Sequence, residues 1–146
     1  MKKPAPRTHP PISYNELVQY ERDRLSRRLA ALKQAEKHIR AIEPDLLVLH
    51  EQHGIYCSPD RFTVRDRSIP YSFRACFVLQ LDSGGIASDY NDRLVNAFLG
   101  LGWIFEREGY EGQYGTVILR KPKTQTRIEL GSSVELRNNI KQRERT

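Results

Sequence analysis

The stretch SFRACFVLQLD, residues 72–82, decides the fold of this chain. Its apolar residues alternate with others, so that Phe73, Ala75, Phe77, Leu79 and Leu81 share one face. A period of two residues is typical of a β-strand with one face in a core. The stretch therefore predicts a strand inside a sheet, and the SGG that follows ends it.

Helix and turn signals extend this strand into a small sheet. Ser88 is a helix N-cap and Gly102 a helix stop, which predicts a helix over 89–101 with Tyr90, Leu94, Phe98 and Leu101 on its inner side. Strands are expected at RFTVRDR (61–67), WIFER (103–107), QYGTVILRK (113–121) and TRIEL (126–130). The expected fold is α+β: a small, mostly antiparallel sheet in the order strand-strand-helix-strand-strand-strand, with one helix packed on a face. The strands that flank the helix are expected to be parallel neighbours.

A long amphipathic helix is predicted before the sheet. Ser13 and Glu16 form a capping box, and Val18, Leu25 and Leu32 recur at intervals of seven residues. The helix should run over 13–43, where Pro44 interrupts it and opens a short second helix that Gly54 caps. The apolar stripe must be buried on the chain's own sheet or on a second copy, so a homodimer through the long helix is one expectation.

Composition divides the chain into four segments. Residues 1–12 hold four prolines and are expected to form a disordered basic arm, residues 13–53 the two helices, residues 54–131 the α+β body, and residues 132–146 a basic helix or tail. The longest purely apolar run, LLVL, is too short to span a membrane. The two cysteines do not make a disulfide framework. We expect a cytoplasmic protein without a membrane partner.

Charge is segregated along the sequence. Residues 1–40 hold ten Lys/Arg and four Asp/Glu, residues 41–112 hold six and eleven, and residues 113–146 hold eight and three. Net charges of +6, −5 and +5 follow, which total the +6 of the whole chain. Cationic ends favour a polyanionic partner, so nucleic acid or a nucleoprotein complex is the predicted partner. Solvated helices rich in Lys and Arg are the alternative explanation.

Two groups of side chains could contact such a partner. One is a flank of the long helix, although the i,i+4 pairs Asp23–Arg27 and Glu36–Arg40 would partly neutralise it. The other is the open sheet face and the turn beside it, where guanidinium and aromatic planes suit unstacked bases. An ordinary solvated surface would look the same. The nucleic-acid candidates are Arg22, Lys33, Lys37 and Arg40 on the helix, and Arg74, Gln80, Tyr114, Thr116, Arg120, Lys121, Lys123 and Arg127 on the sheet.

The segment HEQHGIYCSPDRF, residues 50–62, looks like a metal site. His50, His53 and Cys57 are three candidate ligands, but structural zinc sites use four and usually contain paired Cys-x-x-Cys units. Imidazolium groups in the last turn of a helix are also favoured by its dipole. We predict no metal and no cofactor.

The segment CFVLQLDSGG…YNDRLVNAFLGLGWIF…QYGTVILR resembles the small ferredoxin-like endoribonucleases of toxin and CRISPR-adaptation systems. That family places an Asp after its first strand and follows it with a helix and two strands. The resemblance covers less than half of the chain, and the loop between Trp103 and Gln113 is longer here. It implies a metal-dependent endoribonuclease in which Asp82 is catalytic, with Asp89 and Asp92 close by.

The leading prediction is a non-enzymatic protein that binds nucleic acid or a nucleoprotein. A phage- or plasmid-borne regulator or inhibitor of a nucleic-acid-processing machine would fit this make-up. The endoribonuclease is one alternative. The other is a protein–protein adapter whose long helix docks into a partner groove through Leu25, Leu29, Leu32 and Ile39.

Overall fold

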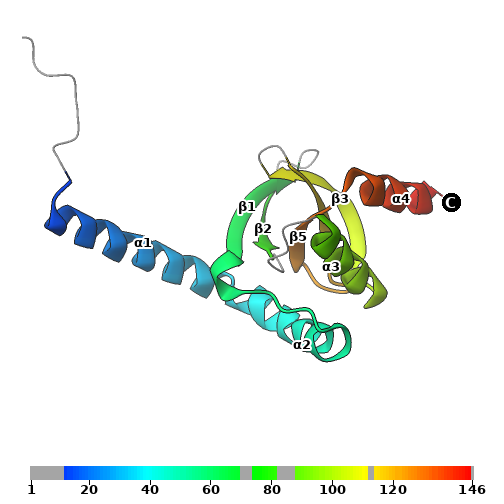
Figure 1. Cartoon of the computed structure of the whole chain (residues 1–146), viewed down its shortest axis with the longest axis horizontal. Helices are drawn as coiled ribbons and strands as arrows, with labels where there is room; N and C mark the ends of the chain where they lie inside the picture. Colours follow the sequence, from blue (N-terminus) through cyan, green and yellow to red (C-terminus); the bar gives the residue numbers. More distant parts are fainter. Residues whose placement is uncertain (1–11, 70–73, 82–87, 112–113, 146) are drawn as a thin grey trace, which may run out of the picture. The chain divides into compact units, whose positions relative to one another are not determined.

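The computed structural model describes residues 12–69, 74–81, 88–111 and 114–145. The chain divides into two compact units, residues 1–34 and residues 35–146. Among the residues described, the first unit holds the helix α1 and the second holds all of the strands (Figure 1). The fold class is α+β with a mostly antiparallel sheet, as the sequence predicts.

Helix α1 spans Tyr14–Gln34 and begins at the predicted cap, where the Ser13 hydroxyl accepts a hydrogen bond from the Glu16 amide at 3.1 Å. None of its residues is buried. Leu25 and Leu29 are 57% and 56% exposed, so the apolar stripe of this helix is not covered by anything in the described part of its unit. An amphipathic helix without a covering surface is a candidate for contact with another molecule.

The predicted break at Pro44 is wrong. Helix α2 spans Glu36–His53 and contains Pro44, and the break lies at Ala35, whose φ of −94° and ψ of 4° separate α2 from α1. Ala35 is fully buried in the core of the second unit, whereas Pro44 is exposed. A proline on a solvated side removes one hydrogen bond without breaking the helix, because water satisfies the carbonyl that loses its donor. The predicted cap at Gly54 is confirmed by its left-handed φ of 64°.

A one-turn 3-10 helix, Pro59–Arg61, leads from α2 into the sheet. The strands are β1 (Thr63–Ile69), β2 (Arg74–Gln80), β3 (Ile104–Glu111), β4 (Tyr114–Arg120) and β5 (Arg127–Gly131). Their order is β1-β2-β5-β4-β3, with β2 and β5 parallel and every other pair antiparallel.

The strands that flank the sheet helix are therefore not neighbours, which corrects the prediction. β3 lies at the far edge, because the chain returns through the β3–β4 hairpin and the β4–β5 turn before β5 pairs with β2. The Gly-rich stretch after residue 107, predicted to be a loop, continues β3 to Glu111. Pairing with β4 holds this extension, with Gly109 opposite Thr116.

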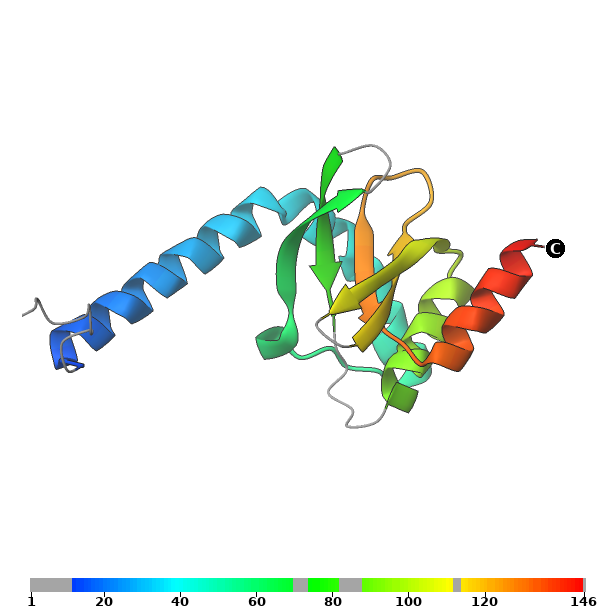
Figure 2. The same cartoon turned by 90° about the horizontal axis from the view of Figure 1, so that it is seen from above.

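The core lies between one sheet face and three helices. Leu79, Val117, Leu119, Ile128 and Leu130 form the sheet side of this core. Helices α2, α3 (Ser88–Gly100) and α4 (Val134–Arg145) pack on it, and Figure 2 shows α2 and α3 behind the strands. The predicted helix over 89–101 is confirmed, as is its stop at Gly102, which has a φ of 95°. The C-terminal segment forms a helix rather than a tail.

In the part of the chain that the structure describes, no helix has both the length and the apolar character needed to cross a membrane.

Candidate nucleic-acid interface

The sheet face opposite the core carries the side chains that alternate with the core residues. The strand register places Arg65 beside Val78 and Arg107 beside Ile118. Because side chains of paired residues point the same way, all of them share this face. We call it the inner face, and its described members are Arg65, Val78, Gln80, Arg107, Thr116, Ile118, Arg120, Arg127 and Glu129.

The inner face is concave. Val78, Ile118, Thr116 and Glu129 on it are almost completely buried, although the core helices pack on the other face. Figure 1 shows the edge strands β1 and β3 curving toward each other. Because the sheet curls toward the inner face, the central side chains of this face are buried without a helix of the described residues covering them. The curl also brings the long side chains of several strands close to these central residues.

A buried carboxylate lies at the centre of this face. Glu129 is 2% exposed and accepts hydrogen bonds from the Thr116 hydroxyl at 2.6 Å and the Gln80 amide at 2.8 Å. Gly109 makes room for it, since a Cβ there would lie 2.6 Å from Glu129 Oε2 and 2.7 Å from Thr116 Oγ1. A buried charge persists only when hydrogen bonds and counter-charges stabilise it, so this group is positioned by three strands.

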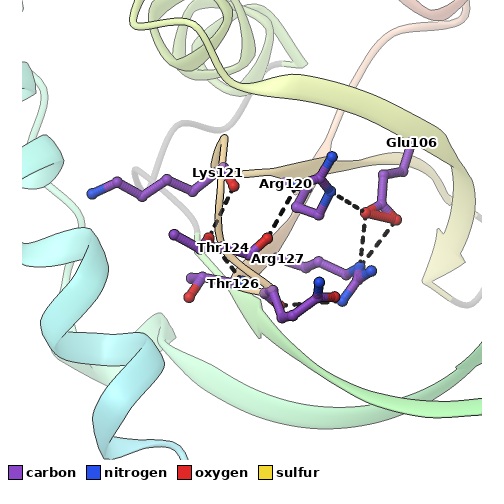
Figure 3. Close-up of polar contacts among 7 residues, drawn as sticks. Glu106, Arg120, Lys121, Thr124, Thr126 and Arg127 are labelled. Carbon is purple, nitrogen blue, oxygen red and sulfur yellow. Dashed lines mark hydrogen bonds and ion pairs between the residues drawn. The ribbon is translucent and has the colours of Figure 1, made fainter.

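Two arginines of the inner face share a second carboxylate. Glu106 Oε1 lies 3.1 Å from Arg120 Nε and 2.9 Å from Arg127 Nε, and its Oε2 lies 3.0 Å from Arg127 Nε (Figure 3). Glu106 sits at a β-bulge, where the register of β3 shifts between Phe105 and Arg107. Glu106 follows the core-facing Phe105 and so points to the inner face, and the bulge brings the next residue, Arg107, to the same face, because one extra residue reverses the alternation of the strand.

The β4–β5 turn connects this cluster to α2. Lys121 donates to the Ala41 carbonyl at 2.6 Å and pairs with Asp45 at 3.1 Å, and His38 Nδ1 lies 2.8 Å from the Thr126 hydroxyl. Burial lowers the pKa of His38, and the positive charges of Lys37 and Arg127 lower it further. The start of α2 therefore lies against the β4–β5 turn within the second unit.

The structure divides the predicted helix stripe between the two units. Arg22 and Lys33 belong to α1, whereas Lys37 and Arg40 belong to α2, so they do not form a stripe on one continuous helix. The predicted Glu36–Arg40 pair is confirmed at 2.8 Å, and this hydrogen bond raises the pKa of Arg40. The predicted Asp23–Arg27 pair is absent from the residues described, where Asp23 instead accepts from Gln19 at 2.8 Å.

The predicted sheet residues come together in part. The inner face holds Gln80, Thr116, Arg120 and Arg127. Lys123 is exposed in the β4–β5 turn, with a φ of 64°. The side chains of Arg74 and Tyr114 lie outside the described part of the structure, although the backbones of both residues belong to strands.

The C-terminal cations are not a separate positive end. Carboxylates from the acidic middle of the sequence pair with them across the fold, which the sequence analysis did not foresee. Besides the contacts of Glu106 and Asp45, Glu108 lies 3.3 Å from both Arg137 and Lys141. The pairs are Arg120 and Arg127 with Glu106, Lys121 with Asp45, and Arg137 and Lys141 with Glu108.

Sequence reasoning missed four charged residues of this site: Arg65, Glu106, Arg107 and Glu129. In TVRDR, residues 63–67, Arg65 follows the apolar Val64, so alternation predicts that its side chain points away from the core. The sequence therefore contained the signal that places Arg65 on this face. Glu106 alternates with the core-facing Phe105 and carried the same signal, whereas Arg107 was not predictable, because the bulge that places it on this face depends on pairing with β4. Glu129 lies in a strand whose other face is apolar, and its burial follows from the curl of the sheet.

The described residues include the three candidate metal ligands but only part of the endoribonuclease alternative. His50 and His53 lie in the last turn of α2, as predicted, and the His50 ring packs edge-on against Tyr56. No group of three or more His, Cys, Asp or Glu in the described residues could hold a metal ion. Asp82, the predicted catalytic residue of the endoribonuclease alternative, lies outside the described residues, as does the side chain of Asp89. Asp92 accepts a hydrogen bond from the Ser133 amide at 2.7 Å, at the start of α4.

Comparison of the chain with models of known protein families, with curated proteins and with solved structures found no match in any of the three.

Proposed function

We propose that this protein binds nucleic acid, alone or within a nucleoprotein complex, without altering it chemically. The observation that carries the proposal is the charge of the inner face. In the described part of the sheet, this face brings together four arginines, Arg65, Arg107, Arg120 and Arg127, around Glu106 and Glu129. Guanidinium groups bind phosphate oxygens in a fork geometry and stack on bases, which suits them to this partner.

The first unit would add affinity that does not depend on sequence. Residues 1–34 contain eight Lys/Arg and three Asp/Glu, a net charge of +5, whereas residues 35–146 contain sixteen and fifteen, a net charge of +1. Almost all of the excess positive charge therefore belongs to the smaller unit. A cationic segment of this kind attracts a polyphosphate over a distance of about one Debye length, roughly 10 Å at 0.1 M salt.

Salt-dependent binding tests the proposal. The dissociation constants of the full chain for labelled single-stranded RNA, single-stranded DNA and duplex DNA would be measured by fluorescence anisotropy. About four phosphate contacts would weaken binding roughly 100-fold between about 50 and 200 mM salt. Arg65→Gln combined with Arg107→Gln should weaken it further at every salt concentration.

The matched control removes the same charge from the core side of the sheet. Arg137→Gln with Lys141→Gln alters two cations that pair with Glu108 and belong to α4. Equal losses in the two double variants, or binding that does not depend on salt, would reject the inner face as the interface. Cleavage of the RNA in Mg²⁺ by the full chain, lost in Asp82→Asn, would replace binding by the endoribonuclease alternative.

A second proposal, that α1 pairs with α1 of a second copy, is favoured by its uncovered stripe. An antiparallel pair centred on Leu25 sets Val18 beside Leu32 of the second copy and brings Glu21 close to the other copy's Arg28. A parallel pair would instead place like charges together at both positions. Glu21 pairs with Arg24 in the single chain, but both side chains are more than 60% exposed, and such pairs contribute little.

Sedimentation velocity of the full chain at roughly 1 to 100 μM tests this pairing, since contacts of this small size give weak dimers. Leu25→Asp with Leu29→Asp should yield a monomer at every concentration. Tyr20→Asp is the control, because Tyr20 is 59% exposed on the opposite side of α1. A monomeric parent chain, or a dimer that survives the Leu variants, would refute the pairing and return the stripe to the adapter hypothesis. Ile39, which that hypothesis also used, packs against the core of the second unit.

A further inference from the structure

Among the described side chains, the cluster of Glu106, Arg120 and Arg127 is not electrically balanced. Two guanidinium groups share one carboxylate, and the side chains of Arg127, Glu106 and Arg120 are 12%, 23% and 27% exposed. Partial burial strengthens the repulsion between the two cations, because less water screens it. One further negative charge would balance the cluster.

The two guanidinium groups are also oriented by the backbone of the turn. Arg120 Nη1 donates to the Thr124 carbonyl at 3.0 Å, and Arg127 Nη1 donates to the Gln125 carbonyl at 3.1 Å. These bonds hold both groups when the carboxylate is absent, so a ligand would meet a preorganised pair of forks.

We propose that Arg120 and Arg127 form a subsite for a backbone phosphate, and that Glu106 occupies this subsite in the unbound protein as an internal competitor. The inference rests on the proposed function. It adds that Arg120 and Arg127 contact a phosphate of the nucleic acid, and that Glu106 limits the affinity of this contact. Glu106 is suited to yield its place, because a bulge residue is not held by ladder pairing on both sides, and its side chain can turn away without separating β3 from β4.

A competitor and a purely structural counter-ion predict opposite effects of one substitution. Glu106→Gln keeps the size of the side chain and removes its charge. If Glu106 competes with phosphate, the variant binds more tightly, because no ion pair has to be broken first. If Glu106 only neutralises the arginines, the variant is less stable and binds no better than its added charge explains.

The chain offers a matched control for that added charge. Glu108 is on the same strand, also contacts two cations and is 28% exposed, but its partners Arg137 and Lys141 belong to α4 on the core side. Glu108→Gln therefore changes the net charge equally, away from the subsite. With a labelled single-stranded RNA, we expect Glu106→Gln to lower the dissociation constant about tenfold and Glu108→Gln by less than about threefold.

A second pair of variants covers a failure of Glu106→Gln to fold. Arg127→Lys keeps the charge and loses the fork, so it should weaken binding about fivefold or more, whereas Arg137→Lys should not. A readout without nucleic acid uses inorganic phosphate, which should raise the melting temperature of Glu106→Gln more than that of Glu108→Gln at equal ionic strength.

The outcomes separate the two proposals. An unmodified chain that binds RNA with the expected salt dependence, while Glu106→Gln does no better than Glu108→Gln, overturns the subsite and leaves the proposed function standing. The subsite is also overturned if Arg127→Lys and Arg137→Lys bind equally well. A chain that binds no nucleic acid at any salt concentration, and whose Glu106→Gln variant gains nothing from phosphate, overturns both.

Discussion

At the scale of single residues, Glu129 combines the strongest structural constraint with a place inside the candidate interface. It is a carboxylate that water hardly reaches, and Thr116 and Gln80 hydrogen-bond to it from neighbouring strands. Its removal would leave a hydroxyl and an amide without their acceptor inside the curled sheet. A buried donor that loses its acceptor destabilises the folded state, because water hardly reaches this position to replace the acceptor.

Glu129→Ala should therefore lower the free energy of unfolding by about 2 to 4 kcal/mol, from the lost hydrogen bonds and the cavity together. Urea unfolding followed by circular dichroism measures it. Glu135→Ala, at an exposed position in the first turn of α4, is the control and should change stability by less than about 1 kcal/mol. A similar small loss for Glu129→Ala would contradict the structural role of the buried carboxylate.

His38 makes stability depend on pH. Its pKa is lowered from 6.5 by burial first, and then by Lys37 and Arg127. The unfolded chain therefore takes up a proton at a higher pH than the folded chain does, so stability rises with pH across this window and is lost as pH falls through it. The melting temperature should be lower at about pH 5.5 than at about pH 7.5, and the difference should shrink in His38→Gln. An unchanged difference in that variant would assign the effect to other groups.

At the scale of elements, two glycines should differ in their response to substitution, because their backbone conformations differ. Gly54 and Gly100 both have open space where a Cβ would be, but Gly54 has a φ of 64° and Gly100 is helical. Gly54→Ala should cost about 1 kcal/mol, because an L side chain is strained there, whereas Gly100→Ala should cost nothing. Chemical denaturation of both variants checks the difference, and an equal effect would argue against the left-handed cap.

The elements themselves could largely be predicted from local patterns. Alternation predicted strand β2, and Ser88 and Gly102 bounded the sheet helix within one or two residues. Errors arose where tertiary contacts override local rules. Burial of Ala35 sets the helix break, Pro44 is tolerated on a solvated side, and pairing with β4 extends β3 through Gly109.

At the scale of the whole molecule, the charge map could be predicted only as sums along the sequence. The positive excess of residues 1–34 is visible there, but the pairing of C-terminal cations with Glu106, Glu108 and Asp45 is not, because these groups meet only after the strands are ordered. For the candidate interface, the sequence likewise predicted arginines on an open sheet face, but it did not predict the carboxylates that lie beside them. Sequence sums do not report which charges become neighbours.

The two units should also differ in their resistance to proteolysis. Arg22, Arg24, Arg27, Arg28 and Lys33 are exposed on a helix without a buried residue, so brief trypsin treatment of the dilute chain should cut within 22–33 first. The expected product is a lasting fragment from about residue 34 onward, identified by mass spectrometry. Early cuts at Arg120 or Arg127 instead would contradict the stability assigned to the sheet, and added nucleic acid should slow the cuts in α1 if it binds there.

Gly109 has a consequence for how this chain can evolve. Any side chain at that position would displace the carboxylate of residue 129, which lies twenty positions further along the sequence. The two positions are therefore expected to change as a pair in descendants of this protein. A homologue with alanine at position 109 should lack the acidic residue at position 129. A search for distant homologues should therefore look for this glycine and this glutamate together.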